Sequence, residues 1–270
     1  MQLRILHRTT YRYDEVVKYS AQALRLTPRR EGRQRVLAWS MQAPGRRTNQ
    51  VDAHGNVTHL LTVEDPHKEI EIIVTGDVEV GGEGELLAHE GTLSPLAYLF
   101  ATPLTVADEA IGRLSKENLG GTEPLRERLY ALAGAVGERV RYQKGATSVE
   151  DTAAAVLARG EGVCQDQAHV FISCCRAAGI PVRYVSGYLY SGDGRNGGTA
   201  ASHAWVDAWV AESKAWLGID VTQGEPTGVQ HCRLAVGRDY LDAAPVRGVR
   251  RGGGREMMDV DVLVSKASDQ

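Results

Sequence analysis

One stretch decides the interpretation of this chain: Gly160-Glu161-Gly162-Val163-Cys164-Gln165-Asp166-Gln167-Ala168-His169. Its two glycines allow a tight, exposed approach, and the apolar run that follows predicts a helix as far as Ala178. Cys164 is therefore expected at or near the N-terminus of this helix, where unpaired N–H groups and the positive end of the helix dipole stabilise a thiolate. The same N–H groups are suited to hold an oxyanion. The stretch thus predicts a nucleophilic cysteine.

Such a nucleophile needs a base within hydrogen-bond reach and an acceptor behind the base. Residues 202–210 alternate as a strand, which places His203 and Asp207 on one face. Residues 216–222 predict a second strand that contains Asp220, and the short connection makes the two strands antiparallel neighbours. We expect Asp220 rather than Asp207 to orient His203, because an adjacent strand reaches the far side of the ring more easily. The predicted triad is Cys164, His203 and Asp220.

Outside this region the hydrophobic pattern changes from strand-like to helical. The first 80 residues contain short alternating runs separated by turn residues, a pattern typical of a small antiparallel β-sandwich. Residues 81–84 carry three glycines and mark a boundary, so we predict an N-terminal domain at 1–82 and a catalytic domain at 83–270. Apolar residues in the second part first follow helical spacing, notably from Leu125 to Val140, and then alternate again. We expect an α+β fold with a loop at 191–200 that could cover the site.

Composition and charge exclude several classes of function. The chain has 270 residues, with 34 acidic and 31 basic side chains and a net charge of −3, a balance that argues against nucleic-acid or membrane-surface binding. No apolar run approaches the roughly 20 residues that cross a bilayer, and the N-terminus does not resemble a signal peptide. Four unpatterned cysteines indicate a reducing compartment, so we expect a cytoplasmic protein.

Three motifs follow one another in the chain, at 162–169, 202–206 and 218–222. In their sequence and order the chain resembles the bacterial transglutaminase-like family of the papain-like cysteine protease superfamily. The likeness continues in Ala177 to Tyr188, in the opening residues 7–29 and in the tail at 238–254, so it covers nearly the whole chain. One departure is visible: Val221 and Gln223 stand where family members often have Pro and Asn.

The resemblance implies a papain-like transglutaminase core with an antiparallel sheet and a nucleophile helix, preceded by the N-terminal domain common in that family. It also implies Cys164, His203 and Asp220 as the triad. The expected activity is thiol-dependent acyl transfer on a peptide or protein amide, most simply by a peptidase, amidase or isopeptidase that forms a thioester. A protein-glutamine transamidase and a non-catalytic binding or assembly module are the alternatives.

Other candidate residues have structural interpretations. We expect Cys174 and Cys175 in the core, Cys232 as an incidental thiol and His169 in a structural role. Asp166 is expected to favour the start of the helix. The spacings typical of zinc sites are absent, so no metal and no cofactor is expected.

Overall fold

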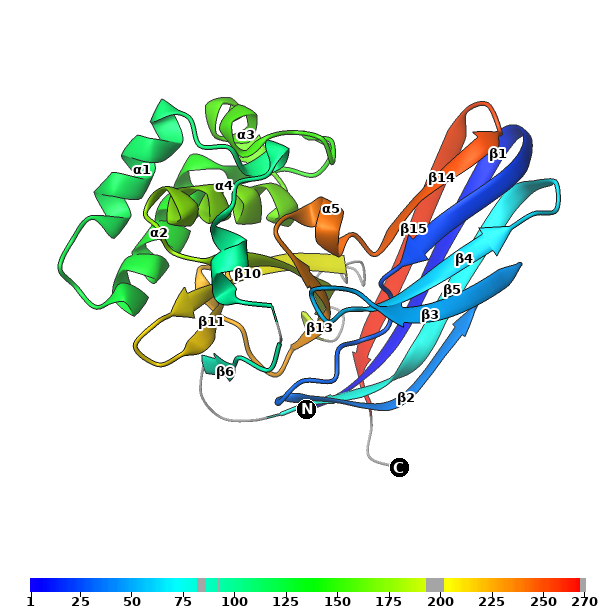
Figure 1. The fold of residues 1–270 in the computed structure, drawn as a ribbon, viewed down its shortest axis with the longest axis horizontal. Helices are drawn as coiled ribbons and strands as arrows, with labels where there is room; N and C mark the ends of the chain where they lie inside the picture. Colours follow the sequence, from blue (N-terminus) through cyan, green and yellow to red (C-terminus); the bar gives the residue numbers. More distant parts are fainter. Residues whose placement is uncertain (82–85, 92, 193–201, 268–270) are drawn as a thin grey trace.

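The computed structural model describes residues 1–81, 86–91, 93–192 and 202–267. Figure 1 shows two parts side by side, one built of helices on a sheet and the other of strands alone. The fold is α+β with curled antiparallel sheets, as expected from the sequence. Most of the predicted boundary at 81–84 and most of the predicted loop at 191–200 lie outside the described residues.

The N-terminal part is organised by one long strand, β1 (Gln2–Leu24). Its first half pairs with β5 and its second half with β4, in a sheet with the order β2-β5-β1-β4-β3. The alternating apolar residues of β1 point to the inner face, where Leu3, Ile5 and Leu24 are fully buried. The other strands of this path are β2 (Gln34–Gln42), β3 (Arg46–Val51), β4 (Val57–Val63) and β5 (His67–Val80).

The C-terminal tail returns to this first sheet. Strand β14 (Val246–Gly252) pairs with the second half of β1, and β15 (Glu256–Lys266) pairs with the first half. Figure 1 shows these two orange-red strands beside the blue β1. The predicted division at residue 82 assigned the tail to the catalytic domain, and the structure differs there. Each half of β1 had one edge left to pair, and such long-range pairing leaves no local signal in the sequence.

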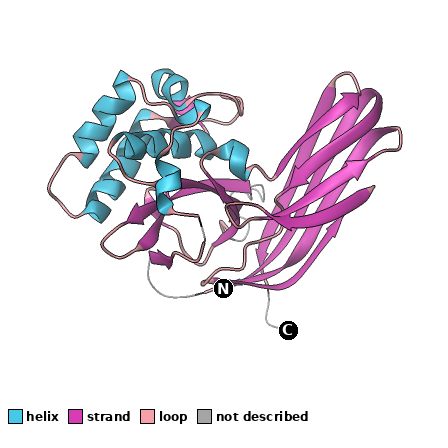
Figure 2. Cartoon of the chain, viewed as in Figure 1, coloured by secondary structure: helices cyan, strands magenta, loops and turns pink. Residues whose placement is uncertain are grey.

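The second part is a six-stranded antiparallel sheet with the order β12-β11-β10-β9-β13, in which β6 (Leu86–Ala88) also pairs with β11. Its strands are β9 (Val182–Leu189), β10 (Ser202–Val210), β11 (Ala215–Asp220), β12 (Glu225–Pro226) and β13 (His231–Gly237). Figure 2 shows helices gathered on one side of this sheet. They are α1 (Glu109–Leu119), α2 (Leu125–Arg139), α3 (Ala153–Arg159) and α4 (Cys164–Ala177).

Helix α4 lies at the centre of the second core. Every residue from Asp166 to Arg176 is buried, because α1, α2 and α3 cover one side of α4 and strands β9 and β10 cover the other. Short elements complete this part: 3₁₀ turns at 95–99 and 103–105, α5 (Tyr240–Ala243), and the two-residue strands β7 (Arg141–Tyr142) and β8 (Glu161–Gly162). In the part of the chain that the structure describes, no helix is long and apolar enough to cross a membrane.

Two side-chain amides join the parts along the edge of the second sheet. Gln34 donates from Nε2 to the carbonyl of Arg233 at 2.8 Å and accepts from the Arg233 N–H at 2.7 Å. Asn56 makes the same pair of bonds with Val236, both at 2.8 Å. Strand β13 is at the end of its sheet, so these amides replace a missing neighbour strand. The N-terminal part therefore completes the edge of the second sheet.

Candidate active site

The nucleophile candidate stands at the first residue of α4. Gly160 ends α3 with a left-handed φ of 76°, and the chain then turns through β8 into the new helix. Asp166 reaches back to the start of α4, where its Oδ2 accepts from the Val163 N–H at 2.7 Å and from the Thr147 hydroxyl at 2.6 Å. This confirms that Asp166 fixes the helix start. Cys164 is half-buried, whereas the other three cysteines are buried.

The amides at the beginning of α4 divide into two groups. Those of Asp166 and Gln167 donate to the Val163 carbonyl, at 2.9 Å and 3.1 Å. The N–H groups of Cys164 and Gln165 have no acceptor within the helix, because the carbonyls that they would need lie before its start, as at the beginning of every helix. They combine with the helix dipole to favour negative charge at the Cys164 side chain and on an oxygen bound beside it.

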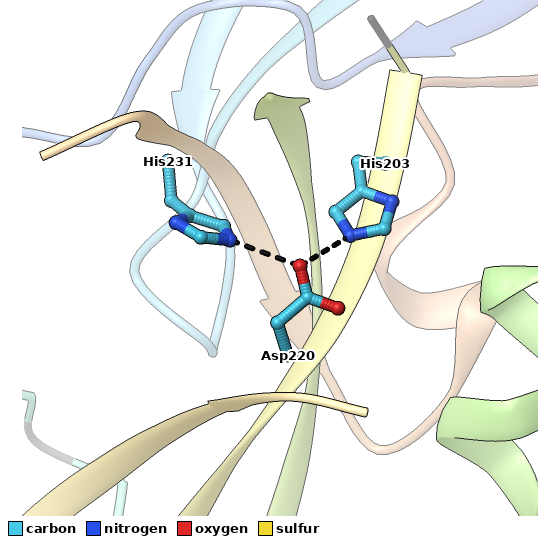
Figure 3. Close-up of side chains that lie close together, drawn as sticks. All are labelled: His203, Asp220 and His231. Atoms are coloured by element: carbon cyan, nitrogen blue, oxygen red, sulfur yellow. Dashed lines mark hydrogen bonds and ion pairs between the residues drawn. The ribbon is translucent and has the colours of Figure 1, made fainter. Parts of the chain in front are cut away.

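His203 and Asp220 meet across neighbouring strands. The pair Val206–Ile219 fixes the register, which puts Asp220 opposite Trp205 and two residues along from His203. His203 donates from Nε2 to Asp220 Oδ2 at 2.7 Å. Asp220 is fully buried and the His203 side chain is 10% exposed. In Figure 3 the second ring nitrogen of His203 points away from Asp220.

The charges of this pair are set by their hydrogen bonds against the effect of burial. Burial lowers the pKa of His203, but hydrogen bonds with Asp220 and Cys164 outweigh it and raise the pKa to about 10. Burial raises the pKa of Asp220, but hydrogen bonds from two histidines hold it well below its ordinary value. His203 is thus protonated at neutral pH and lies between the Asp220 carboxylate and the Cys164 side chain.

The backbone after Asp220 holds the other carboxylate oxygen. Asp220 Oδ1 accepts from the N–H groups of Thr222 and Gln223, at 3.1 Å and 3.2 Å. These are backbone donors, so the contact does not depend on the side chains of Val221 and Gln223. The Thr222 hydroxyl donates to Gln167 Oε1 at 2.7 Å and so ties this turn to helix α4.

A second histidine, His231 on β13, is part of the cluster and was not predicted. It donates from Nε2 to the same Asp220 Oδ2 at 3.1 Å, as Figure 3 shows. No motif spacing pointed to it, because β13 is separated from β11 by β10 and β9 in the sheet. The only signal available was a histidine at the start of an apolar strand.

The same three residues offer a conceivable metal site. One ligand atom each from His203, Asp220 and His231 lie within 4.8 Å of one another. However, the Gly228 N–H donates to His231 Nδ1 at 3.1 Å, which requires the proton of this imidazole to be on Nε2. A protonated nitrogen cannot bind a metal ion, so the observed hydrogen bonds suit a proton-holding cluster better.

The remaining candidates are placed elsewhere. Asp207, the alternative carboxylate, accepts from Arg183 at 2.7 Å and from Arg233, and His203 is not among its partners. His169 is fully buried and accepts from the Tyr240 N–H at 3.1 Å, a structural role as expected. Cys174, Cys175 and Cys232 are all fully buried in the two cores.

Two sequence profiles match the chain. That of the bacterial transglutaminase-like N-terminal region matches residues 3–79, and that of the transglutaminase-like superfamily matches residues 113–221. The second range contains Cys164, His203 and Asp220.

Similar proteins occur in mycobacteria. The uncharacterized protein ML0607 of Mycobacterium leprae is 32% identical over 285 residues, which span 98% of this chain and 99% of the relative. The uncharacterized protein Rv2569c of Mycobacterium tuberculosis is 33% identical over 271 residues, which span 91% of this chain and 86% of the relative.

The fold is also found in a crystal structure of a candidate cysteine protease from Cytophaga hutchinsonii. It is 21% identical, with a TM-score of 0.80 over 100% of this chain and 92% of that protein. Together the profile matches, the mycobacterial relatives and the shared fold lead to one conclusion: the chain belongs to the transglutaminase-like superfamily and carries the bacterial transglutaminase-like N-terminal region.

Proposed function

We propose that the protein is a thiol-dependent acyl-transfer enzyme that cleaves an amide bond of a peptide or protein, as a peptidase, amidase or isopeptidase. The observation that carries this proposal is the hydrogen bond between His203 and Asp220 at 2.7 Å, with Cys164 acting on the same imidazole from the start of α4. Nucleophilic catalysis requires a thiol, a base within hydrogen-bond reach of it and a third group that orients the base.

In the resting enzyme the Cys164 proton is already on Nδ1 of His203, whose Nε2–H is given to Asp220, so that Cys164 and His203 form a thiolate–imidazolium pair. In the first step the thiolate attacks the amide carbonyl carbon, and the carbonyl electrons move to the oxygen. The Cys164 N–H at the helix start stabilises this oxyanion. Asp220 stays ionised throughout and holds the imidazolium in place.

In the second step the oxyanion re-forms the carbonyl and the carbon–nitrogen bond breaks. His203 gives its proton to the leaving amine, and the acyl group remains on Cys164 as a thioester. Water, deprotonated by His203, then attacks the thioester, which releases the acid and the Cys164 thiolate. We infer hydrolysis rather than transamidation because no second amine-binding group was identified among the described residues. The chemistry needs a reduced Cys164, which fits the cytoplasmic location that we propose.

Intact-mass measurement tests this proposal directly. Wild type and Cys164→Ala are incubated with a panel of peptides and acyl-glutamine donors, with and without an added primary amine. We expect a transient adduct on wild type alone, and the donor that forms it identifies the acyl class. Free acid as the product supports hydrolysis, whereas a new amide supports a transamidase. Absence of any adduct, together with ordinary Cys164 reactivity, would support the non-catalytic module.

A further inference from the structure

We propose that His231 is a positioning residue: as a neutral hydrogen-bond donor, it holds the Asp220 carboxylate in the orientation that keeps the proton on His203. This inference rests on the proposed function of Cys164 and His203. It assigns a part in the reaction to a residue from an edge strand and, through that strand, to the N-terminal part of the chain.

The donor role of His231 follows from its two contacts. The Gly228 N–H points at Nδ1, 3.1 Å away, so Nδ1 must be the unprotonated acceptor. The ring proton is then on Nε2, which donates to Asp220 Oδ2 at 3.1 Å. The His231 side chain is only 2% exposed, so water does not compete for either contact.

This donor completes the hydrogen bonding of the carboxylate. Oδ1 accepts from two backbone N–H groups, and Oδ2 accepts from His203 and His231. Four donors on one buried carboxylate fix its plane, so that Oδ2 stays within hydrogen-bond distance of His203. That hydrogen bond raises the pKa of His203 and keeps its proton in place. Without His231 the carboxylate would be freer to rotate away from His203, and the hydrogen bond that stabilises the imidazolium would weaken.

The fold brings His231 across two strands to reach Asp220. The ring of Trp205 packs beside both histidines, 5.2 Å from the His231 centroid and 6.1 Å from that of His203, and the two histidine centroids are 6.3 Å apart. Gly187 on β9 makes room for this ring, since a Cβ there would lie 2.3 Å from a Trp205 ring atom. Trp205 therefore serves as the common surface on which both imidazoles rest.

Several charged groups lie around His231. Besides Asp220 these are His203, whose ring centroid is 6.3 Å from that of His231, and the pair Arg233–Glu31, at 2.7 Å, which lines the same small cavity as His231. Arg233 also pairs with Asp207, which in turn pairs with Arg183. Arg33 lines the small cavity of about 90 Å³ beside His231. Glu31 and the charged residues Arg183, Asp207 and Arg233 of β9, β10 and β13 are thus engaged with one another. His231 faces Asp220 as its single ionic partner among the contacts described.

Two amide variants separate the two contacts of His231. In His231→Gln the side-chain amide reaches the Nε2 position and keeps a donor for Asp220. In His231→Asn the shorter side chain keeps the contact with the Gly228 N–H but cannot reach Asp220. His231→Phe, which fills the volume of the ring without any donor, serves as a second donor-free variant if the Asn protein does not fold. Urea unfolding establishes that each variant is folded.

The readout is the rate of Cys164 alkylation by iodoacetamide between pH 4 and pH 11. We expect wild type and H231Q to react as a thiolate–imidazolium pair up to an alkaline limit near the His203 pKa of about 10. In H231N we expect this limit to fall by about one pH unit or more, which is a tenfold change in the ionisation equilibrium.

Each outcome bears on the inference. A folded H231N or H231F protein whose alkaline limit of Cys164 alkylation equals that of wild type would overturn the inference. An equal fall of this limit in H231Q and H231N would also overturn it, because the effect would then come from loss of the ring and not from loss of the donor. If wild type itself reacts only as an ordinary thiol, the proposed function fails and takes the inference with it. An alkaline limit near that expected for wild type, which falls in H231N and H231F but not in H231Q, supports both the proposed function and the role of His231.

Discussion

Two aspartates on neighbouring strands of the second sheet have opposite surroundings. Asp207 on β10 and Asp220 on β11 are both fully buried and face the same side of the sheet. Asp207 is held by two guanidinium groups, those of Arg183 and Arg233. Asp220 is held by two imidazoles and two backbone N–H groups.

The difference lies in what the partners can do with a proton. A guanidinium keeps its charge at every pH of interest, so the Asp207 cluster is a permanent ion network that joins the sheet to Glu31 of the N-terminal part. An imidazole can both hold a proton and pass it to another group, so the Asp220 cluster can keep a proton on His203 and give it up during a reaction. A buried carboxylate beside arginines thus serves the fold, and one beside histidines is suited to chemistry.

The largest expected effect is that of Asp220→Asn on reaction rate. Loss of the orienting carboxylate should reduce the rate of acylation of Cys164 on the order of 10³–10⁴-fold, as in other triads. Stability should change much less, because an amide can still accept from the backbone donors. Single-turnover acylation, with urea unfolding as the control, measures both. A variant that acylates within tenfold of wild type would remove Asp220 from the mechanism.

Asp207→Asn should show the reverse behaviour. It leaves two buried guanidinium groups without their shared carboxylate, which should cost about 3–5 kcal/mol of unfolding free energy. In the protein that remains folded, the pH dependence of Cys164 alkylation should equal that of wild type. Urea unfolding and the alkylation profile together test this. An altered profile in a folded D207N protein would erase the distinction between the two aspartates.

A third histidine shows what happens without a carboxylate. His7 contacts the Tyr188 hydroxyl and Thr9, both at 2.8 Å, and burial lowers its pKa to about 4. Since the unfolded chain binds this proton below about pH 6.5, the stabilising contribution is complete above that pH and is lost as the pH falls towards 4. The unfolding free energy should drop by up to about 1.4 kcal/mol per pH unit from this group.

Urea unfolding between pH 7 and pH 4 measures that loss, with His7→Gln as the matched variant. The variant should show a shallower dependence on pH in this window. An equal slope in wild type and H7Q would mean that His7 is not held neutral, and the contrast with His203 would then not depend on the neighbouring carboxylate.

The smallest expected effect concerns the amide that closes the edge of β13. Gln34→Ala removes the partner of the Arg233 N–H and carbonyl, and should cost about 1–3 kcal/mol because buried backbone groups are left unsatisfied. Gln42→Ala, at an exposed position of the same strand, is the control and should stay within about 0.5 kcal/mol of wild type. Equal small losses in both would show that the edge of β13 does not need Gln34.

The features that could be predicted from the sequence are those set by short-range patterns of residues. The glycines before Cys164, the apolar residues after it and the alternation from His203 to Val210 fixed the elements of the site. The preference for Asp220 over Asp207 used the expected neighbouring strands, and the structure places Asp220 against His203. A pattern with a period of two or of 3.6 residues was sufficient for each of these inferences.

What could not be predicted depends on pairing between distant segments. The return of residues 246–266 to β1 and the approach of His231 to Asp220 are set by strand order, which a single sequence does not display. The same holds for the arginines around Asp207, since Arg183 and Arg233 belong to two other strands. Long-range order was therefore the missing information, both for the fold and for the site.

The central claim is that Cys164 is a reactive nucleophile prepared by His203, and site-resolved alkylation tests it most directly. Native wild-type protein is treated briefly with iodoacetamide at pH 6, and labelling of all four cysteines is measured by peptide mass. We predict rapid labelling of Cys164 that is lost in His203→Gln, and little labelling of the buried Cys174, Cys175 and Cys232. Slow labelling of Cys164 at the rate of an ordinary thiol, unchanged by the His203 substitution, would contradict the claim.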